Sequence, residues 1–419
     1  MGLLIENALV DGVRKNIYVK DNIIESIGSG GRRDDEVIDA KGMVALPGLI
    51  NTHTHSAMTL LRGYGDDMLL HEWLRDKIWP AESNLGVEDV YWGSKLACLE
   101  MIKSGTTCFN DQYWFMEGTA KAVADMGLRA VLAEAYIDLF DEDKAAASMK
   151  KTKNFVEHIR SLKNDRIKPA LGPHSIYTVS EKSLIELKEV SDELGLLIHF
   201  HLSETKKENN DFVKKTGMRP VEYLEKIGFL CARLVAAHCV WLEGAEYKTL
   251  AKYGVKVAHN PVSNMKLSVG SLIHYDKMKE AGLVVSIGTD GCASNNNLDM
   301  FEEMKFAALG QKIQSNDPTA LPADETFRLA SSGGASALDI KAGLIKPGLL
   351  ADIILVDLRR PQLIPQHNLY SNLVYSANGS CVDTVVCDGR VLMRGGKVKG
   401  EYEIMEKAAD VAQDVVSRN

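Results

Sequence analysis

The sequence predicts an α/β fold in which a (β/α)8 barrel is joined to a small β-sandwich domain built from both ends of the chain. Two observations support this prediction. Short, nearly continuous apolar runs alternate with helix-length segments through the middle of the 419 residues, and both ends carry short strands of alternating polarity. A chain of this length exceeds most single-core domains, which agrees with one large barrel plus a smaller domain.

The β-rich domain begins with residues 3–45, which read as short strands separated by turns such as Asp11-Gly12 and Asp21-Asn22. The far end has the same texture: "ADIILVDL" and "CVDTVVCDGRVLMRGGKVKG" alternate apolar and polar residues around Asp388-Gly389 and Gly395-Gly396. We therefore expect residues 1–48 and 343–419 to form one composite β-sandwich domain.

The middle of the chain, residues 49–342, contains eight apolar runs, each followed by a segment long enough for a helix. They are "LPGLINTHTH", "TTCFND", "RAVLAEAYID", "IKPALGPHS", "LLIHFHLSE", "LVAAHCV", "VKVAHNP" and "LVVSIGTDG". Apolar strands that alternate with helices indicate a parallel sheet covered on both faces. Eight such units match a TIM-like barrel, which is typically about 250 residues long.

Polar residues gather where these predicted strands end. Seven of the eleven histidines lie there, and two carboxylates accompany them. These strand-end residues are His53, His55, His174, His199, His201, Glu204, His238, His259 and Asp290. Because the carboxyl ends of all barrel strands surround one mouth, where barrel active sites are built, we expect these side chains to meet.

Strand periodicity selects candidate metal ligands within this group. Residues two apart share a face of a strand, so His53 and His55 can reach the same ion. His199 and His201 also share a face, and His201, nearer the mouth, is the expected ligand. Asp290 completes the set. Three imidazoles and one carboxylate suit one divalent cation, with zinc expected, while iron and manganese fit the same ligands.

Structural roles compete with these assignments. A single histidine at a strand end is more often a hydrogen-bonded structural residue, an alternative that favours His199 and His259 as structural and stays open for His238. The segment "HEWLR" at 71–75 begins like a metalloprotease motif but lacks its second histidine. The cysteine-based zinc deaminase signature is absent.

Composition limits the partners. The net charge is -8 and no basic stripe stands out, so we expect no nucleic-acid partner. No stretch approaches the ~20 apolar residues of a membrane span, and the N-terminus does not resemble a signal peptide. Seven scattered cysteines without a Cys-x-x-Cys pair suggest reduced thiols in a cytoplasm. A small molecule is the expected partner.

Seven segments together resemble the amidohydrolase superfamily, and within it the methylthioadenosine/S-adenosylhomocysteine deaminase group. They are "PGLINTHTH", "GPHSIYT", "HFHLSET", "AAHCVWL", "HNPVSNMKL", "GTDGCASNNNLDM" and "KPGLLADIILVD". The resemblance covers nearly the whole chain. It implies a metal-dependent hydrolase barrel with a β-sandwich, deaminating adenosine-type nucleosides as a homo-oligomer (dimer or tetramer). No lysine ends the fourth strand, so one metal is expected rather than a lysine-bridged pair.

The resemblance also assigns roles to residues. The implied metal ligands are His53, His55, His201 and Asp290. The implied proton carriers are Glu204, His238 and Asp290. The implied substrate contacts are Glu82 on the ribose hydroxyls, His174 on the base, and Glu204 and Asp290 at the reacting carbon. Trp79, three residues before Glu82, is expected either to cover the nucleoside or to pack in the core, and Glu82 could instead be a solvated helix carboxylate.

One departure from the group bears on the substrate. The group's arginine for the homocysteine carboxylate falls in "GLRAVLAEAYIDL", where Arg129 is early and Glu134 stands at the expected place. A glutamate there would repel a carboxylate, which predicts 5′-deoxyadenosine first, methylthioadenosine and adenosine next, and S-adenosylhomocysteine more weakly. The alternatives are deamination of another heterocycle (guanine, a triazine or a pterin), and a non-catalytic scaffold, which the complete ligand set disfavours.

Overall fold

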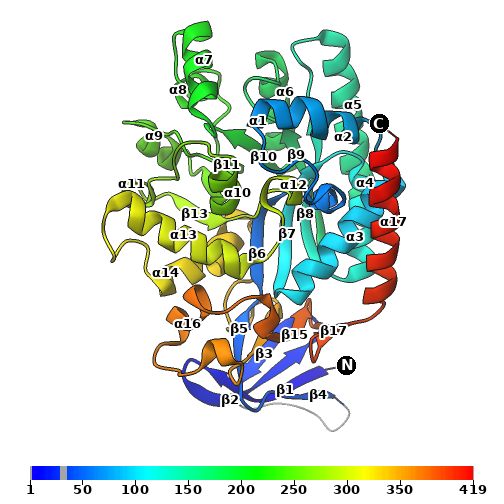
Figure 1. Cartoon of the computed structure of the whole chain (residues 1–419), viewed down its shortest axis with the longest axis vertical. Coiled ribbons are helices and arrows are strands. Elements are labelled where there is room, and N and C mark those ends of the chain that lie inside the picture. Colours follow the sequence, from blue (N-terminus) through cyan, green and yellow to red (C-terminus); the bar gives the residue numbers. More distant parts are fainter. Residues whose placement is uncertain (1, 29–34, 419) are drawn as a thin grey trace.

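The computed structural model describes residues 2–28 and 35–418, which form an eight-stranded parallel barrel and a nine-stranded mixed sheet (Figure 1). The predicted α/β fold is confirmed, and each of the eight apolar runs is a barrel strand. In chain order these are β6 (Leu49–Thr54), β7 (Thr106–Tyr113), β8 (Arg129–Tyr136), β9 (Ile167–Pro173), β10 (Leu197–Leu202), β11 (Leu234–His238), β12 (Lys256–His259) and β13 (Val284–Ile287).

The barrel closes where the first and last strands meet. The backbone N–H groups of Thr289 and Asp290, just after β13, donate to the carbonyl of His53 on β6 over 3.0 and 2.9 Å. Small and branched side chains such as Ala133, Ala170 and Ala258 pack together inside. Alternate residues of the strands, such as Phe109, Leu132 and Phe200, face outward and pack against the helices.

Helices cover the outside of the barrel in chain order. They are α3 (Val87–Lys103), α4 (Met116–Met126), α5 (Glu142–Ser161), α6 (Glu181–Leu194), α7 (Lys206–Thr216), α8 (Pro220–Lys226), α9 (Glu246–Lys252), α11 (Tyr275–Ala281), α13 (Met300–Ser315), α14 (Ala323–Arg328) and α15 (Gly334–Ala337). Four short helices lie in loops that follow strands: α1 (Leu70–Trp73), α2 (Trp79–Ser83), α10 (Pro261–Lys266) and α12 (Cys292–Asn295). Within the described ranges, no helix is long and apolar enough to cross a membrane.

The mixed sheet combines strands from both ends of the chain. They are β1 (Gly2–Val10), β2 (Val13–Lys20), β3 (Ile23–Ile27), β4 (Glu36–Asp39), β5 (Met43–Pro47), β14 (Ile353–Asp357), β15 (Val382–Cys387), β16 (Arg390–Arg394) and β17 (Lys397–Val398). Strand β5 pairs antiparallel with β14 over five residues. Among the described residues, all nine strands belong to one continuous sheet.

This sheet lies at the end of the barrel opposite the mouth, as Figure 1 shows. Arg129, the first residue of β8, makes buried ion pairs with Asp352 at 3.0 Å and Asp388 at 2.9 Å. The C-terminal helix α17 (Glu401–Ser417) runs along α3 of the barrel, and α16 (Leu369–Tyr375) packs on α13 and α14. We propose that the domains divide as 1–48 plus 343–419 and 49–342, because β5 and β14 lead directly into and out of the barrel.

Candidate metal and catalytic site

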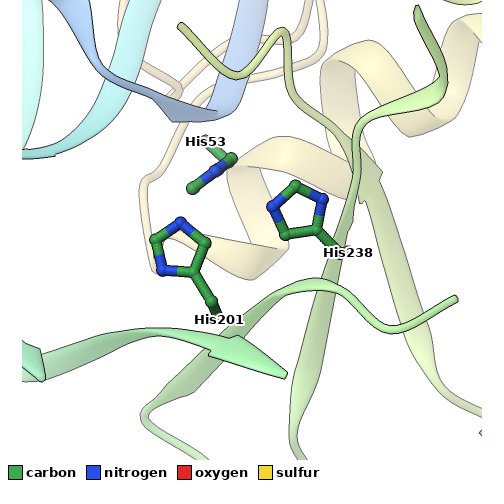
Figure 2. Close-up of side chains that lie close together, drawn as sticks. All are labelled: His53, His201 and His238. Atoms are coloured by element: carbon green, nitrogen blue, oxygen red, sulfur yellow. The ribbon is translucent and has the colours of Figure 1, made fainter. Parts of the chain in front are cut away.

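Imidazoles from three strands converge at the mouth of the barrel. His53 on β6, His201 on β10 and His238 on β11 turn their rings toward one another (Figure 2). Their nitrogen atoms lie within 4.8 Å of one another, and a second group at the same spacing joins His53 to His55 and Asp290. Five of the nine strand-end residues therefore lie together in the structure.

The backbone fixes which ring nitrogen two of these histidines offer. His55 Nδ1 lies 2.6 Å from the carbonyl of Gln112, and His201 Nδ1 lies 3.0 Å from the carbonyl of His174. Because a carbonyl accepts only, both Nδ1 atoms carry the proton. Nε2 is then the atom of each ring that faces the cluster and is left to bind a metal, an arrangement common around protein-bound metals.

The environment of His53 fits a cation. Its Nδ1 lies 2.6 Å from His199 Nε2, while its own Nε2 is buried and has no hydrogen-bond partner in the described part of the chain. That Nε2 lies 3.3 Å from Asp290 Oδ1, and His55 Nε2 lies 3.2 Å from the same oxygen. An orphaned buried nitrogen beside a shared carboxylate oxygen is what the donor set of a divalent ion requires.

The other carboxylate oxygen of Asp290 is already occupied. The hydroxyls of Ser263 and Ser294 donate to Oδ2 over 2.6 and 2.9 Å. Asp290 itself has a positive φ of 61°, an uncommon conformation outside glycine that is often found at functional sites. The two serines thus orient the carboxylate so that Oδ1 faces the imidazoles.

Electrostatics at the cluster favour a positive charge. Burial lowers the pKa of His53 to about 3 and moves that of His201 well below its ordinary value, so both rings are neutral. Burial is the largest single influence on His55 and opposes its charge, but the hydrogen bond and charge of Asp290, the carbonyl of Gln112 and the charge of Asp111 together raise the pKa of His55 to about 9. The site thus holds a proton beside Asp290, and a divalent ion would take that proton's place.

His238 differs from the other imidazoles in what its Nδ1 contacts. The amide groups of Asn264 and Asn260 donate to it over 3.0 and 3.3 Å. With Nδ1 accepting, the proton of the ring lies on Nε2, which is 3.9 Å from Glu204 Oε2. Although its ring belongs to the histidine cluster, a protonated Nε2 donates a hydrogen bond and does not bind a metal, so we assign His238 as a donor.

Glu204 sits between the end of β10 and the start of α7. Its backbone N–H, and that of Ser203, donate to the carboxylate of Glu208 over 2.8 and 3.1 Å, which fixes the turn. Burial raises the pKa of Glu204 above its ordinary value. A carboxyl group with a raised pKa, facing an imidazole at the mouth, is suited to accepting and releasing protons.

Glu82 reaches the same mouth from α2. The hydroxyl of Tyr113, the last residue of β7, donates to Glu82 Oε1 over 2.8 Å. Burial raises the pKa of Glu82 to about 7. The alternative of a freely solvated helix carboxylate therefore does not describe Glu82. Trp79, one turn earlier, is 58% exposed and is not part of the core.

His174 follows β9 and lies beside His201, with ring centroids 4.7 Å apart. Its Nδ1 is 3.0 Å from the hydroxyls of both Ser175 and Thr178, which leaves Nε2 for another partner. Burial lowers its pKa to about 4, so the ring is neutral. A neutral imidazole with one free nitrogen can hydrogen-bond a ring nitrogen of a base.

The structure corrects the interpretation of Glu134. Its carboxylate accepts hydrogen bonds from the backbone of Met116 at 2.9 Å and Phe115 at 3.3 Å, and it pairs with Lys151 at 2.5 Å. It shares the outward face of β8 with Tyr136, so it points at the helices. The expected repulsion between Glu134 and a substrate carboxylate is therefore wrong, because Lys151 neutralises a group that does not face the mouth.

Several residues of the site went unrecognised in the sequence. They are Gln112, Tyr113, Asn260, Ser263, Asn264 and Ser294, all of which contact predicted site residues. The signal available was weak: Gln112 and Tyr113 extend the polar end of the second strand, and three others lie in "HNPVSNMKL" just after the seventh. Position after a strand marks them as near the mouth without saying what they touch.

Comparison with known proteins shows which family the chain resembles along its length. Residues 44–392 match the model of the amidohydrolase family. A 5-methylthioadenosine/S-adenosylhomocysteine deaminase of Archaeoglobus fulgidus is 49% identical over 98% of this chain and 97% of its own length. A 5′-deoxyadenosine deaminase of Methanoregula boonei is 52% identical over 91% of this chain and 86% of its own.

A solved structure supports the same relationship. The crystal structure of an adenosine deaminase from Xanthomonas campestris with bound zinc is 33% identical, has a TM-score of 0.93, and covers 99% of this chain and 98% of its own. The family model matches most of the chain, and the two relatives and the solved structure are similar along almost its whole length. The chain therefore belongs to the amidohydrolase family.

Proposed function

We propose that this protein is a metal-dependent deaminase that hydrolyses 5′-deoxyadenosine and related adenosines to the inosine derivative and ammonia. The observation that carries the proposal is the meeting of His53, His55 and Asp290 at the mouth, with Glu204 and His238 beside them. The names of the relatives from Archaeoglobus fulgidus and Methanoregula boonei support adenosine-type substrates.

Four residues would hold one divalent metal ion: His53, His55, His201 and Asp290. Zinc is the proposed ion, because imidazole and carboxylate suit it and because the similar Xanthomonas campestris structure has bound zinc. When bound, such an ion would supply the chemistry of lowering the pKa of water toward ~7, so that hydroxide would be available at neutral pH.

Glu204 and His238 carry the protons in this proposal. Glu204 takes a proton from the water and delivers it to N1 of the adenine ring, which makes C6 more electrophilic. His238, with its proton on Nε2, donates a hydrogen bond to the attacking oxygen, and Asp290 helps to pass a proton to the departing ammonia. In the overall reaction, one water molecule is consumed and one ammonia molecule is released for each nucleoside.

Substrate recognition falls to groups around the rim. His174 contacts a nitrogen of the base through Nε2, and Glu82 accepts hydrogen bonds from the 2′- and 3′-hydroxyls of the ribose. Trp79, exposed and one helical turn from Glu82, covers the nucleoside. Glu204 and Asp290 contact the reacting amino-bearing carbon and its ring nitrogen.

The 5′ group faces apolar surface in this proposal. Leu139 and Phe140, in the loop after β8, are 54% and 50% exposed, and Tyr177, after β9, is 50% exposed. Uncharged 5′ groups therefore suit this rim. The ammonium of Lys215 lies 4.2 Å from the centre of the Phe140 ring, where it could pair with the carboxylate of S-adenosylhomocysteine. We therefore propose that S-adenosylhomocysteine is a weaker substrate on this apolar rim and not an excluded one.

The test is kcat/KM for 5′-deoxyadenosine, methylthioadenosine, adenosine and S-adenosylhomocysteine on zinc-loaded protein, followed by the adenine-to-hypoxanthine absorbance change. We expect 5′-deoxyadenosine to lead and S-adenosylhomocysteine to trail. If S-adenosylhomocysteine leads, the proposed 5′ preference is wrong. If no nucleoside reacts, the adenosine assignment is wrong, and guanine, triazines and pterins become the substrates to assay.

We also propose that the protein works in the cytoplasm as a homo-oligomer. All seven cysteines are free thiols, which suits a reducing compartment. Helix α13 exposes Phe306, Leu309 and Ile313 on one face, with Ile313 85% exposed, and a second copy would cover such a face. Light scattering coupled to size-exclusion chromatography measures the oligomeric state, and a mass of 46.1 kDa would mean a monomer.

A further inference from the structure

Tyr113 and Glu82 form a hydrogen bond between the barrel wall and its cover. Tyr113 ends β7 and is only 3% exposed, with its ring in the main apolar core. Glu82 lies on α2, a five-residue helix in the connection between β6 and α3. The hydroxyl of Tyr113 donates to Glu82 Oε1 over 2.8 Å, so a strand of the barrel holds a carboxylate carried by a loop.

Glu82 depends on this contact for its orientation. Within the described residues, no other side chain donates a hydrogen bond to its carboxylate. The surroundings are apolar enough that burial is the largest influence on its pKa. With Oε1 held by Tyr113, Oε2 and the remaining lone pair of Oε1 stay available, which is the arrangement needed to accept two hydroxyl donors at once.

We propose that Tyr113 is a positioning residue for the ribose, and that through Glu82 it makes the enzyme select nucleosides with an intact 2′,3′-diol. This inference rests on the proposed function. Tyr113 suits the role because a phenolic hydroxyl, whose ordinary pKa is about 10, keeps its proton at neutral pH and can donate to a carboxylate. Its ring is fixed by the core, so the hydroxyl is held in place before substrate arrives.

The experiment compares Tyr113→Phe with the unaltered enzyme on adenosine and on 2′,3′-dideoxyadenosine, both zinc-loaded. Tyr91→Phe is the matched control, because the Tyr91 hydroxyl also donates to a carboxylate, Asp125, over 2.8 Å but lies on the outer helices. Glu82→Gln and the double variant complete the set. Zinc content and melting temperature are measured on every variant.

For Tyr113→Phe we expect KM for adenosine to rise about tenfold, the size of one hydrogen bond to a charged group, while kcat changes by less than about twofold. Neither constant for 2′,3′-dideoxyadenosine should change by as much. Tyr91→Phe should leave kcat and KM unchanged for both substrates. In the double variant, the effect of Tyr113→Phe should largely vanish, because its partner is already altered.

Two results would overturn the inference and separate it from the function. If Glu82→Gln discriminates between the two substrates but Tyr113→Phe lowers both equally or changes neither, Glu82 binds the ribose and the positioning role of Tyr113 is wrong. If Glu82→Gln fails to discriminate, the ribose role of Glu82 is wrong, and the inference falls with it.

Discussion

At the scale of the residue, one side-chain type takes several roles because each imidazole has a different neighbour at Nδ1. Carbonyl oxygens beside His55 and His201 place the proton on Nδ1 and free Nε2 as a ligand atom. The amide donor of Asn264 beside His238 instead makes Nδ1 the acceptor and leaves the proton on Nε2. The division between ligand and proton donor is thus made by the surrounding shell, a general property of metal sites.

Changing Glu204 to Gln removes the proposed proton carrier while keeping its shape. We expect kcat for 5′-deoxyadenosine to fall by about 10²- to 10⁴-fold, the usual contribution of a general acid–base group, with zinc content unchanged. Steady-state kinetics and elemental analysis on the same preparation measure both. A variant that keeps more than about one tenth of the activity would show that protons travel by another route.

The pH dependence of ribose recognition follows from Glu82. Burial raises its pKa to about 7, so below that pH the carboxyl is protonated and accepts the diol poorly. The ratio of kcat/KM for adenosine to that for 2′,3′-dideoxyadenosine should therefore rise with pH through about 7 and then level off. Taking the ratio cancels the titration of Glu204, which acts on both substrates. In Glu82→Gln the ratio should be flat, and a slope there would contradict the assignment.

The predicted metal ligands came from two simple properties of the sequence, whereas the catalytic and substrate-binding roles came from the resemblance to the amidohydrolase superfamily. Residues two apart in a strand face the same way, and the carboxyl ends of barrel strands meet. Contacts such as Tyr113 to Glu82 or Asn264 to His238 could not be predicted this way, because they join positions whose distance depends on loop paths. The error at Glu134 was avoidable: Ala133 and Ala135, small and suited to a barrel interior, place Glu134 on the outer face.

At the scale of the element, the strands were predictable because each is a nearly continuous apolar run with a polar end. The short helices α1, α2, α10 and α12 were not. Each has four to six residues, too few to be stable alone, so it forms through tertiary contacts that periodicity does not reveal. These loop helices nevertheless carry Glu82, Ser263, Asn264 and Ser294.

The junction between barrel and sheet depends on Arg129, whose side chain is 5% exposed and paired with Asp352 and Asp388. Arg129→Met leaves the buried Asp352 without its ion-pair partner, while the partly buried Asp388 keeps Arg166 at 3.7 Å. We expect the free energy of unfolding to fall by ~3–5 kcal/mol. Urea unfolding measures it. Arg394→Met is the control, because its pair with Glu36 is exposed and should cost ~1 kcal/mol or less.

Because Arg129 lies at the end of the barrel away from the mouth, the folded fraction of Arg129→Met should keep its kcat. A loss of kcat without a loss of stability would mean that the junction acts on the site. The element that fixes the fold and the elements that carry the chemistry would then not be independent.

At the scale of the whole molecule, the sheet that stabilises the fold and the residues proposed to carry out the chemistry lie at opposite ends of one barrel. The mixed sheet closes the end where the strands begin, and the polar cluster occupies the end where they finish. The proposed metal ligands come from β6, β10 and the segment after β13, so one ion would tie together strands far apart in the sequence.

Metal removal should therefore lower the stability of the whole fold. We expect chelated protein to lose activity and to melt at a lower temperature, and added zinc to restore both. At zinc about 100-fold above its Kd, the gain is about 2.7 kcal/mol. His201→Ala should abolish the response to zinc, whereas His158→Ala, an exposed histidine on α5, should keep it. An unchanged melting temperature on chelation of the unaltered protein would argue against the ligand set.

The pairing of β5 with β14 also determines how late during translation the mixed sheet can be completed. About 300 residues separate the two strands, so at roughly 5–20 residues per second β5 waits on the order of 15–60 seconds on the ribosome before its neighbour exists. During that interval the edge of β5 that later pairs with β14 has no strand to hydrogen-bond with. Nascent chains of this protein are therefore expected to engage chaperones through their first fifty residues, and slowing translation should increase aggregation of unfinished chains without affecting the finished enzyme.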